Sequence, residues 1–395
     1  MHTHQLLLLL LIGYIIYSID KKQNYFPVPV ILVLIGIVLS FIPYFSDITI
    51  SKETIFMIFL PALLFTSAYQ FPLKPLRTNK WVIGSLGTGG LLLTMALLGL
   101  SIYFVGNLFI SLSLVGAFLV ASILTPTDPV SVVNILKKSS SDQRIADIVE
   151  GESLINDGTS IVLFTVFLEM YLNSSKFSIG GFISEFLFVS IGGVALGAAF
   201  GWLMSKLVHF THHKEYQIML SIIVAYGSFY IGEGIGVSGV LSTVTAGLML
   251  SFEFGKNIKE AHFRSSLNGF WGIIEPSLLA VLFLMIGIQS ANYLLFNGWL
   301  LAVLIFIASL VVRYIVLLTT FKGVPKWRKQ FSVNDATLIT WTGIKGTMSV
   351  ALLMGLESAT DNGSSMIISL TFAAIMLSLI IQSIGVYPLT QKLSK

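Results

Sequence analysis

The chain has 395 residues, of which 55% are hydrophobic and only 11% are charged. About a quarter of the residues in a soluble domain are charged, so this composition excludes an ordinary soluble globular protein. The absence of cysteine excludes a disulfide framework, a thiolate nucleophile and a cysteine-ligated metal site. The formal net charge of +4 matters less than the position of each positive charge, because those positions orient a membrane protein.

Apolar runs recur from end to end, and one crossing of a bilayer needs about 17 to 25 such residues. Allowing shorter or interrupted runs, we predict thirteen transmembrane helices in a single membrane domain over residues 1–395. They cover residues 5–19, 28–45, 54–70, 81–106, 108–136, 148–172, 179–208, 217–234, 236–252, 269–289, 297–320, 335–356 and 366–390. The first run has no preceding Lys or Arg and no small-residue cleavage site, so we expect a retained helix and not a signal peptide.

The distribution of Lys and Arg supports this count. With the amino terminus outside, nineteen of the 23 basic residues take cytoplasmic positions and two, Lys52 and Lys176, lie outside; the other two, Arg313 and Lys345, fall within spans. A miscounted helix would invert every later loop and remove this bias. We therefore expect a multi-pass protein of the cell inner (plasma) membrane, surrounded by lipid, with a cytoplasmic carboxyl terminus.

The odd number of spans allows two inverted six-helix repeats, formed by spans one to six and eight to thirteen. The fifth and twelfth spans then correspond, and both are interrupted, by Thr125-Pro126-Thr127-Asp128-Pro129 and by Gly343-Ile344-Lys345-Gly346. Paired broken helices at matching positions of two halves indicate a transporter's binding site. We therefore predict an all-α polytopic membrane protein in which two broken helices cross.

The two prolines of the fifth span free backbone acceptors. Pro126 and Pro129 have no N–H, so the C=O groups of Ser122 and Thr125 lose their helical donors and can ligate a cation. Such backbone survives at membrane depth only where it lines a cavity or is buried in protein. The plainer alternative is a proline kink with Asp128 capping the following half-helix, and the two interpretations are compatible.

The sixth span carries Glu152, Ser153, Asn156 and Asp157. Ser153 and Asp157 lie four residues apart and share a helix face, whereas Glu152 points about 140° away from Asp157. Asp157 is about 14 Å into the span, near the bilayer midplane, where charges are costly and usually functional. We assign Asp157 to ion or proton binding, with a purely structural ion pair as the alternative, and Glu152 to a structural pair with Arg313.

Four motifs occur together and in order: Thr127-Asp128-Pro129, the GESLINDG run at 151–158, Phe270-Trp271 with 283–287, and Gly343-Ile344-Lys345-Gly346. They resemble the monovalent cation/proton antiporters of the bacterial NhaP and animal sodium/proton exchanger type, over nearly the whole chain. The resemblance implies the NhaA-like antiporter fold, a homodimer, a six-helix core domain that moves against a dimer domain, and electroneutral exchange.

The resemblance also implies roles for particular residues. Asp157, Ser153 and Thr127 would hold sodium, while Glu152 and Arg313 would form a structural salt bridge. We include three further positions in the expected ion or proton site: Asp128 and Asn156, which lie within these motifs, and Thr66, which stands where the family usually has a carboxylate near the ion site.

Two positions depart from the family pattern. The family usually has a glutamate after the residues that match Leu63-Leu64-Phe65, but Thr66 stands there, which leaves the choice between sodium and potassium open. If Thr66 lines the ion site, cation binding should be weaker. Lys345 replaces an arginine and keeps its charge. It can balance the negative end of a half-helix, as Asp128 can balance a positive one.

Two further features stand apart from these motifs, and the first of them, Glu275, has no role in the family pattern. Glu275 precedes Pro276 in the tenth span and is either a second proton-linked carboxylate or a residue that faces an aqueous funnel. The second feature is a group of histidines that could sense pH, for which a solvated interfacial cluster is the favoured interpretation; it comprises His209, His212 and His213.

These residues predict exchange of one monovalent cation for one proton by competition at Asp157. One site with two exclusive occupants, exposed alternately to each side, gives one-for-one exchange, and Asn156 adds no second titratable group. A potassium/proton antiporter on the same fold and a cation channel are the alternatives. No His lies inside a predicted span, which argues against an intramembrane hydrolase. We therefore expect no enzymatic activity, no cofactor beyond the transported sodium or lithium and protons, and no nucleic-acid partner.

Overall fold

The computed structural model describes residues 3–19, 28–128, 133, 136–137, 143–173, 179–208, 213–256, 261–360 and 365–393. Within these residues every regular element is a helix. The prediction of an all-helical protein is therefore confirmed for the described part of the chain.

Apolar helices of sufficient length are the main elements. Among the described residues, seven helices could cross a membrane by length and composition: Lys52–Gln70, Leu73–Gly106, Gln143–Asn173, Gly180–Leu207, Arg264–Ser290, Trp299–Gly323 and Met366–Leu393. Shorter apolar helices are Thr3–Ile19, Val28–Ser40, Leu114–Leu124, Gly239–Glu253 and Thr347–Ala359. A membrane protein of many spans follows, whereas the count of thirteen and the inverted repeats stay predictions.

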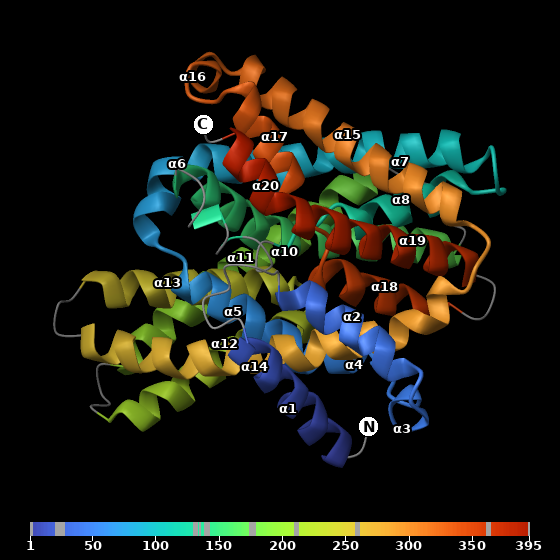
Figure 1. Cartoon of the computed structure of the whole chain (residues 1–395). Coiled ribbons are helices and arrows are strands. Elements are labelled where there is room, and N and C mark those ends of the chain that lie inside the picture. Colours follow the sequence, from blue (N-terminus) through green and yellow to red (C-terminus); the bar gives the residue numbers. More distant parts are fainter. Residues whose placement is uncertain are drawn as a thin grey trace.

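The helices pack as two bundles. The first, here the α14 bundle, contains α1 (Thr3–Ile19), α2 (Val28–Ser40), α5 (Leu60–Gln70), α11 (Ile179–Val208), α12 (Lys214–Gly234), α13 (Gly239–Lys256) and α14 (Ala261–Leu294). Three short elements precede α5: α3 (Pro43–Ser46), α4 (Lys52–Thr54) and a π-helical turn at Ile55–Phe59. Figure 1 shows α1, α12, α13 and α14 in the lower part of the molecule.

The second bundle, here the α10 bundle, contains α6 (Leu73–Ser85), α7 (Leu91–Gly106), α8 (Leu114–Leu124), α10 (Gln143–Asn173), α15 (Trp299–Gly323), α17 (Val333–Trp341), α18 (Thr347–Ala359), α19 (Ser365–Leu377) and α20 (Ser383–Leu393). The π-helical turns Leu86–Gly90 and Ser378–Gln382 join α6 to α7 and α19 to α20, and the short α16 (Pro325–Arg328) follows α15. In Figure 1, α7, α8, α15 and α19 form the upper part of the molecule.

Both expected interruptions are present. α8 ends at Leu124 and residues 126–128 form no helix, while α17 ends at Trp341 and a non-helical stretch at 343–346 leads into α18. The backbone N–H of Asp128 donates to the carbonyl of Ile344 at 2.8 Å, so the two interrupted segments cross.

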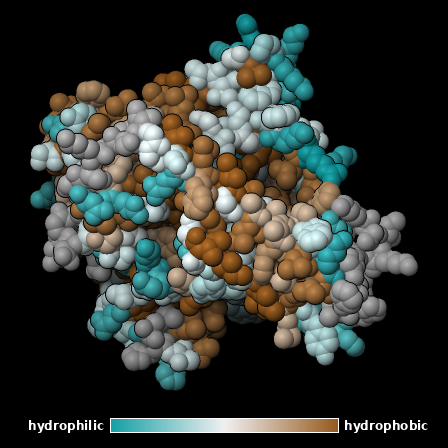
Figure 2. Space-filling view, turned by 180° about the vertical axis from the view of Figure 1, so that it is seen from behind, coloured by the Kyte–Doolittle hydropathy of each residue, from teal (hydrophilic) through white to brown (hydrophobic). Residues whose placement is uncertain are grey.

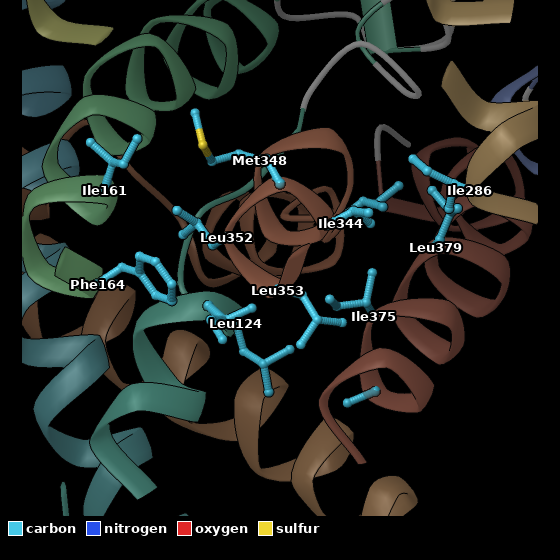
Figure 3. Close-up of a cluster of buried hydrophobic side chains, with 14 of the residues drawn as sticks. Leu124, Ile161, Phe164, Ile286, Ile344, Met348, Leu352, Leu353, Ile375 and Leu379 are labelled. Atoms are coloured by element: carbon cyan, nitrogen blue, oxygen red, sulfur yellow. The ribbon is translucent and has the colours of Figure 1, made fainter. Parts of the chain in front are cut away.

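The half-helix α18 is enclosed by apolar side chains. Figure 3 shows Leu352 and Leu353 of α18 among Leu124 of α8, Phe164 of α10 and Ile375 of α19. Each of these side chains is at most 3% exposed. Close packing on several sides fixes the axis of α18 and therefore aims its amino terminus at the crossing.

The outer surface suits a bilayer. Large apolar side chains are exposed on helices of both bundles, among them Val38, Trp81, Phe104 and Ile273. Figure 2 shows apolar residues gathered over the middle of one face, with hydrophilic residues toward its margins. An apolar zone between polar ends is the arrangement expected of helices in lipid.

Candidate functional site

The ends of the broken helices are capped by charged side chains from the opposite segment. Oδ2 of Asp128 accepts hydrogen bonds from the backbone N–H and the hydroxyl of Thr347, at 3.0 and 2.9 Å, at the start of α18. The ammonium of Lys345 donates to the carbonyl of Thr125, just beyond the end of α8, at 3.4 Å. Each charge faces the end of the helix dipole that it stabilises.

Two glycines permit this crossing. A Cβ at Gly346 would lie 2.4 Å from Oδ2 of Asp128, and one at Gly343 would lie 2.5 Å from Nε of Arg313. Atoms cannot approach so closely, so a larger residue at either position would displace a charged side chain. The glycines of the twelfth span are therefore required by close approach at the crossing.

Helix α10 holds the interrupted part of the fifth span in place. The Ser153 hydroxyl donates to the carbonyl of Thr127 at 2.5 Å, and the Asn156 amide donates to the Thr127 hydroxyl at 2.8 Å. All three residues are buried. The backbone that the proline leaves without helical bonds is thus fixed by side chains from a neighbouring helix.

Glu152 and Arg313 meet on the opposite side of α10. The guanidinium donates to Oε2 of Glu152 at 2.9 Å, and the two side chains are only 4% and 7% exposed. This ion pair links α10 to α15 inside the α10 bundle. Its burial makes each charge depend on the other, because a single buried charge is strongly destabilising.

A cavity of about 270 Å³ lies between the two bundles beside the crossing. The α10 bundle and the segment after α8 contribute Asp128, Val133, Lys137, Glu150, Ser153, Leu154, Asp157, Thr347 and Met348 to its wall. The α14 bundle contributes Leu60, Leu63, Leu64, Ser67, Gln70, Glu275 and Leu279. Because its walls belong to different bundles, this cavity changes shape if one bundle moves against the other.

Asp157 is the carboxylate on the α10 side of this cavity whose bonding is incomplete. Its Oδ1 is shielded from solvent and accepts no hydrogen bond within the described residues. Burying a carboxylate oxygen without a partner is costly, so a proton or a cation at this atom would lower the free energy. Asp157 and Ser153 line the same cavity, as their four-residue spacing predicts.

Three of the expected site residues do not line the cavity: Thr66, Thr127 and Asn156. Thr66 is 1% exposed, and its hydroxyl donates to the carbonyl of Ala62 in its own helix at 2.7 Å. Thr127 and Asn156 lie behind the wall, where they bond to each other.

The structure also places two residues at the site that were not predicted there, Thr347 and Lys137. Thr347 is the first residue of α18 and directly follows the Gly343–Gly346 stretch. Threonine is common where a helix begins, so its place after the interruption is the signal that could have predicted its role. Lys137 pairs with Glu150 at 2.7 Å, and no spacing rule indicates that contact. His213 is exposed, while His209 and His212 lie outside the described residues.

The chain resembles known proteins in sequence and in fold. Residues 6–392 match the family described as "Sodium/hydrogen exchanger, transmembrane". The chain is 30% identical over 402 residues to the Na(+)/H(+) antiporter NhaH of Halobacillus aidingensis, covering 98% of this chain and 97% of that protein. It is 29% identical over 352 residues to the Na(+)/H(+) antiporter NhaP of Pseudomonas aeruginosa, covering 87% and 81%.

A solved structure shares the fold. The sodium proton antiporter MjNhaP1 from Methanocaldococcus jannaschii at pH 8 superposes with a TM-score of 0.78 at 19% identity, over 99% of this chain and 98% of that one. The family match spans nearly the whole sequence, and it includes both broken helices and the cavity between the bundles. The chain belongs to the sodium/hydrogen exchanger family of membrane antiporters.

Proposed function

We propose that this protein is an electroneutral antiporter that exchanges one sodium ion for one proton at Asp157. The observation that carries the proposal is the buried Oδ1 of Asp157, which has no hydrogen-bond partner within the described residues and belongs to a cavity-lining side chain. A carboxylate in that setting binds either a proton or a cation, and the two exclude each other.

The sodium ligands that we propose are Asp157 and Ser153 in the cavity wall and Thr127 directly behind it. Ser153 lines the cavity one helical turn before Asp157, and its hydroxyl rests on the carbonyl of Thr127 at 2.5 Å. The hydroxyl oxygen keeps lone pairs for a cation while its proton is bonded elsewhere. Asp128 and Lys345 would hold the two half-helix ends in register around this site.

A stoichiometry of one for one follows from the neighbour of Asp157. Asn156 cannot titrate, and its amide is already bonded to Thr127. Protonation and cation binding at Asp157 therefore alternate without a second titratable group at position 156, and the net charge moved per cycle is zero.

Exposure of the site to both sides would come from movement of the α10 bundle against the α14 bundle. We propose that the cavity containing Lys137 and Glu150 opens to the cytoplasm, since positive charges favour that side. We further propose that the protein is a homodimer of the plasma membrane, as the family resemblance implies, with its amino terminus outside, as the distribution of Lys and Arg predicts.

The test is proton flux in proteoliposomes under sodium, lithium or potassium gradients, for the wild type and for Asp157→Asn. The wild type should exchange sodium for protons without charge movement, and the asparagine variant should be inactive though folded. Glu169→Gln, in the same helix but outside this cavity, is the matched control and should remain active. Turnover by Asp157→Asn would overturn the proposal, and exchange driven by potassium alone would favour the potassium/proton alternative.

A further inference from the structure

A second carboxylate, Glu275, lines the cavity from the side opposite the ion site. It lies on α14 and shares the cavity wall with Asp157 of α10. The next residue, Pro276, has no N–H, which leaves the carbonyl of Gly272 without its usual helical donor. The α14 wall of the cavity therefore carries an acidic group beside a disturbed turn of helix.

The other two carboxylates in the cavity are already engaged. Oδ2 of Asp128 accepts both the N–H and the hydroxyl of Thr347, and Glu150 forms an ion pair with Lys137 at 2.7 Å. Glu275 differs from them, because within the described residues it has no hydrogen-bond or ion-pair partner. Of the four carboxylates, Glu275 and Asp157 are thus the two whose charge is available to an entering cation.

These two carboxylates belong to different bundles. α14 packs on α1, α2, α5 and α12 and touches the α10 bundle through α19, whereas Asp157 lies on α10 in the opposite wall. If the bundles move against each other to expose Asp157 on the other side, Glu275 stays with α14. The pair would then face one cavity in only one of the two states.

We propose that Glu275 strengthens cation binding from one side of the membrane only, in the state in which Asp157 faces the cavity that contains Lys137. The inference rests on the proposed sodium/proton exchange. An ionised carboxylate across a cavity of about 270 Å³ attracts a monovalent cation through its field and does not need to ligate it. Once the α10 bundle has moved, sodium arriving from the other side no longer meets this field.

The experiment measures the KM for sodium separately on the two sides, in inside-out and right-side-out vesicles at one fixed pH. Glu275→Gln should raise the KM about fivefold on the side of the Lys137 cavity, as expected for loss of one screened charge, and leave the other KM unchanged. Glu275→Asp keeps the charge and should preserve both values. The matched control is Ser277→Ala, two residues along α14, whose hydroxyl bonds to its own helix and does not line the cavity.

Three results would overturn the inference: unchanged KM on both sides, an equal rise on both sides, or a rise confined to the opposite side. If Glu275→Gln cannot be purified, Glu275→Ser supplies a second neutral side chain at the same cavity wall. Failure of the proposed function is distinguishable, because the wild type itself would then show no sodium/proton exchange in the same vesicles.

Discussion

Asp128 of the fifth span caps the amino terminus of α18, because its Oδ2 accepts both the N–H of Thr347 at 3.0 Å and the Thr347 hydroxyl at 2.9 Å. A side chain from one broken helix thus accepts the hydrogen bonds at the amino terminus of the other. Any change at this contact should therefore disturb both halves of the crossing, and the site beside it, at once.

Gly346→Ala should damage transport through this contact. The new methyl group would lie 2.4 Å from Oδ2 of Asp128, so the carboxylate must leave its position at the start of α18. We expect a loss of about 1 to 3 kcal/mol of stability, as overpacking usually costs, and a large fall in exchange rate. Thermal unfolding in detergent and proteoliposome flux would measure both. Gly89→Ala, which has nothing within 4 Å of its added methyl, is the control, and an equal effect there would refute the steric explanation.

Glu152→Gln should destabilise the protein without removing a cavity-lining group. Arg313 would remain buried without a counter-charge, which costs about 3 to 5 kcal/mol in comparable pairs. The expected result is a clearly lower unfolding temperature, while Glu185→Gln, at an exposed position of α11, should leave it unchanged. Replacing both partners, in Glu152→Gln with Arg313→Met, should recover part of the loss, since no unpaired charge remains. Unchanged stability in the single variant would mean that the pair contributes nothing.

Thr66→Val tests whether Thr66 belongs to the ion site, as the sequence predicts, or lies outside the cavity, as the structure places it. The Thr66 hydroxyl donates to the carbonyl of Ala62 and does not line the cavity, so its loss should alter the KM for sodium by no more than about twofold. A several-fold rise in KM would instead place Thr66 in the ion path, as the family pattern suggests. In that case Thr66→Glu should tighten sodium binding or shift the pH profile of transport.

Gln382→Leu should remove the hydrogen bonds that hold the non-helical stretch between α17 and α18 in place. The Gln382 amide donates to the carbonyl of Trp341 at 2.7 Å, and its oxygen accepts from Ser378, which in turn accepts from the N–H of Lys345 at 2.9 Å. Leaving these buried groups unsatisfied should cost about 1 to 3 kcal/mol and slow exchange. Gln391→Leu, in the exposed part of α20, is the control. Equal thermal stability and flux in the two variants would exclude a positioning role for Gln382.

Relations within one helix could be predicted from the sequence. Four residues separate Ser153 from Asp157, so the helical period places both on one face and Glu152 on another, and the structure places the first two on the cavity and Glu152 beside Arg313. Pro126 and the glycines Gly343 and Gly346 likewise mark the interruptions, because missing N–H groups and missing Cβ atoms act locally.

Relations between helices were decided by the tertiary structure. The rotation of α5 turns Leu63, Leu64 and Ser67 to the cavity and Thr66 away from it. A π-helical turn at Ile55–Phe59, which adds a residue to the turn before α5, and packing against α13 accompany this rotation. The opposition of Glu275 to Asp157 has the same origin, since no period connects residues on α10 and α14. Helical periodicity predicts which side chains share a face of one helix, whereas the packing of the helices sets which faces meet.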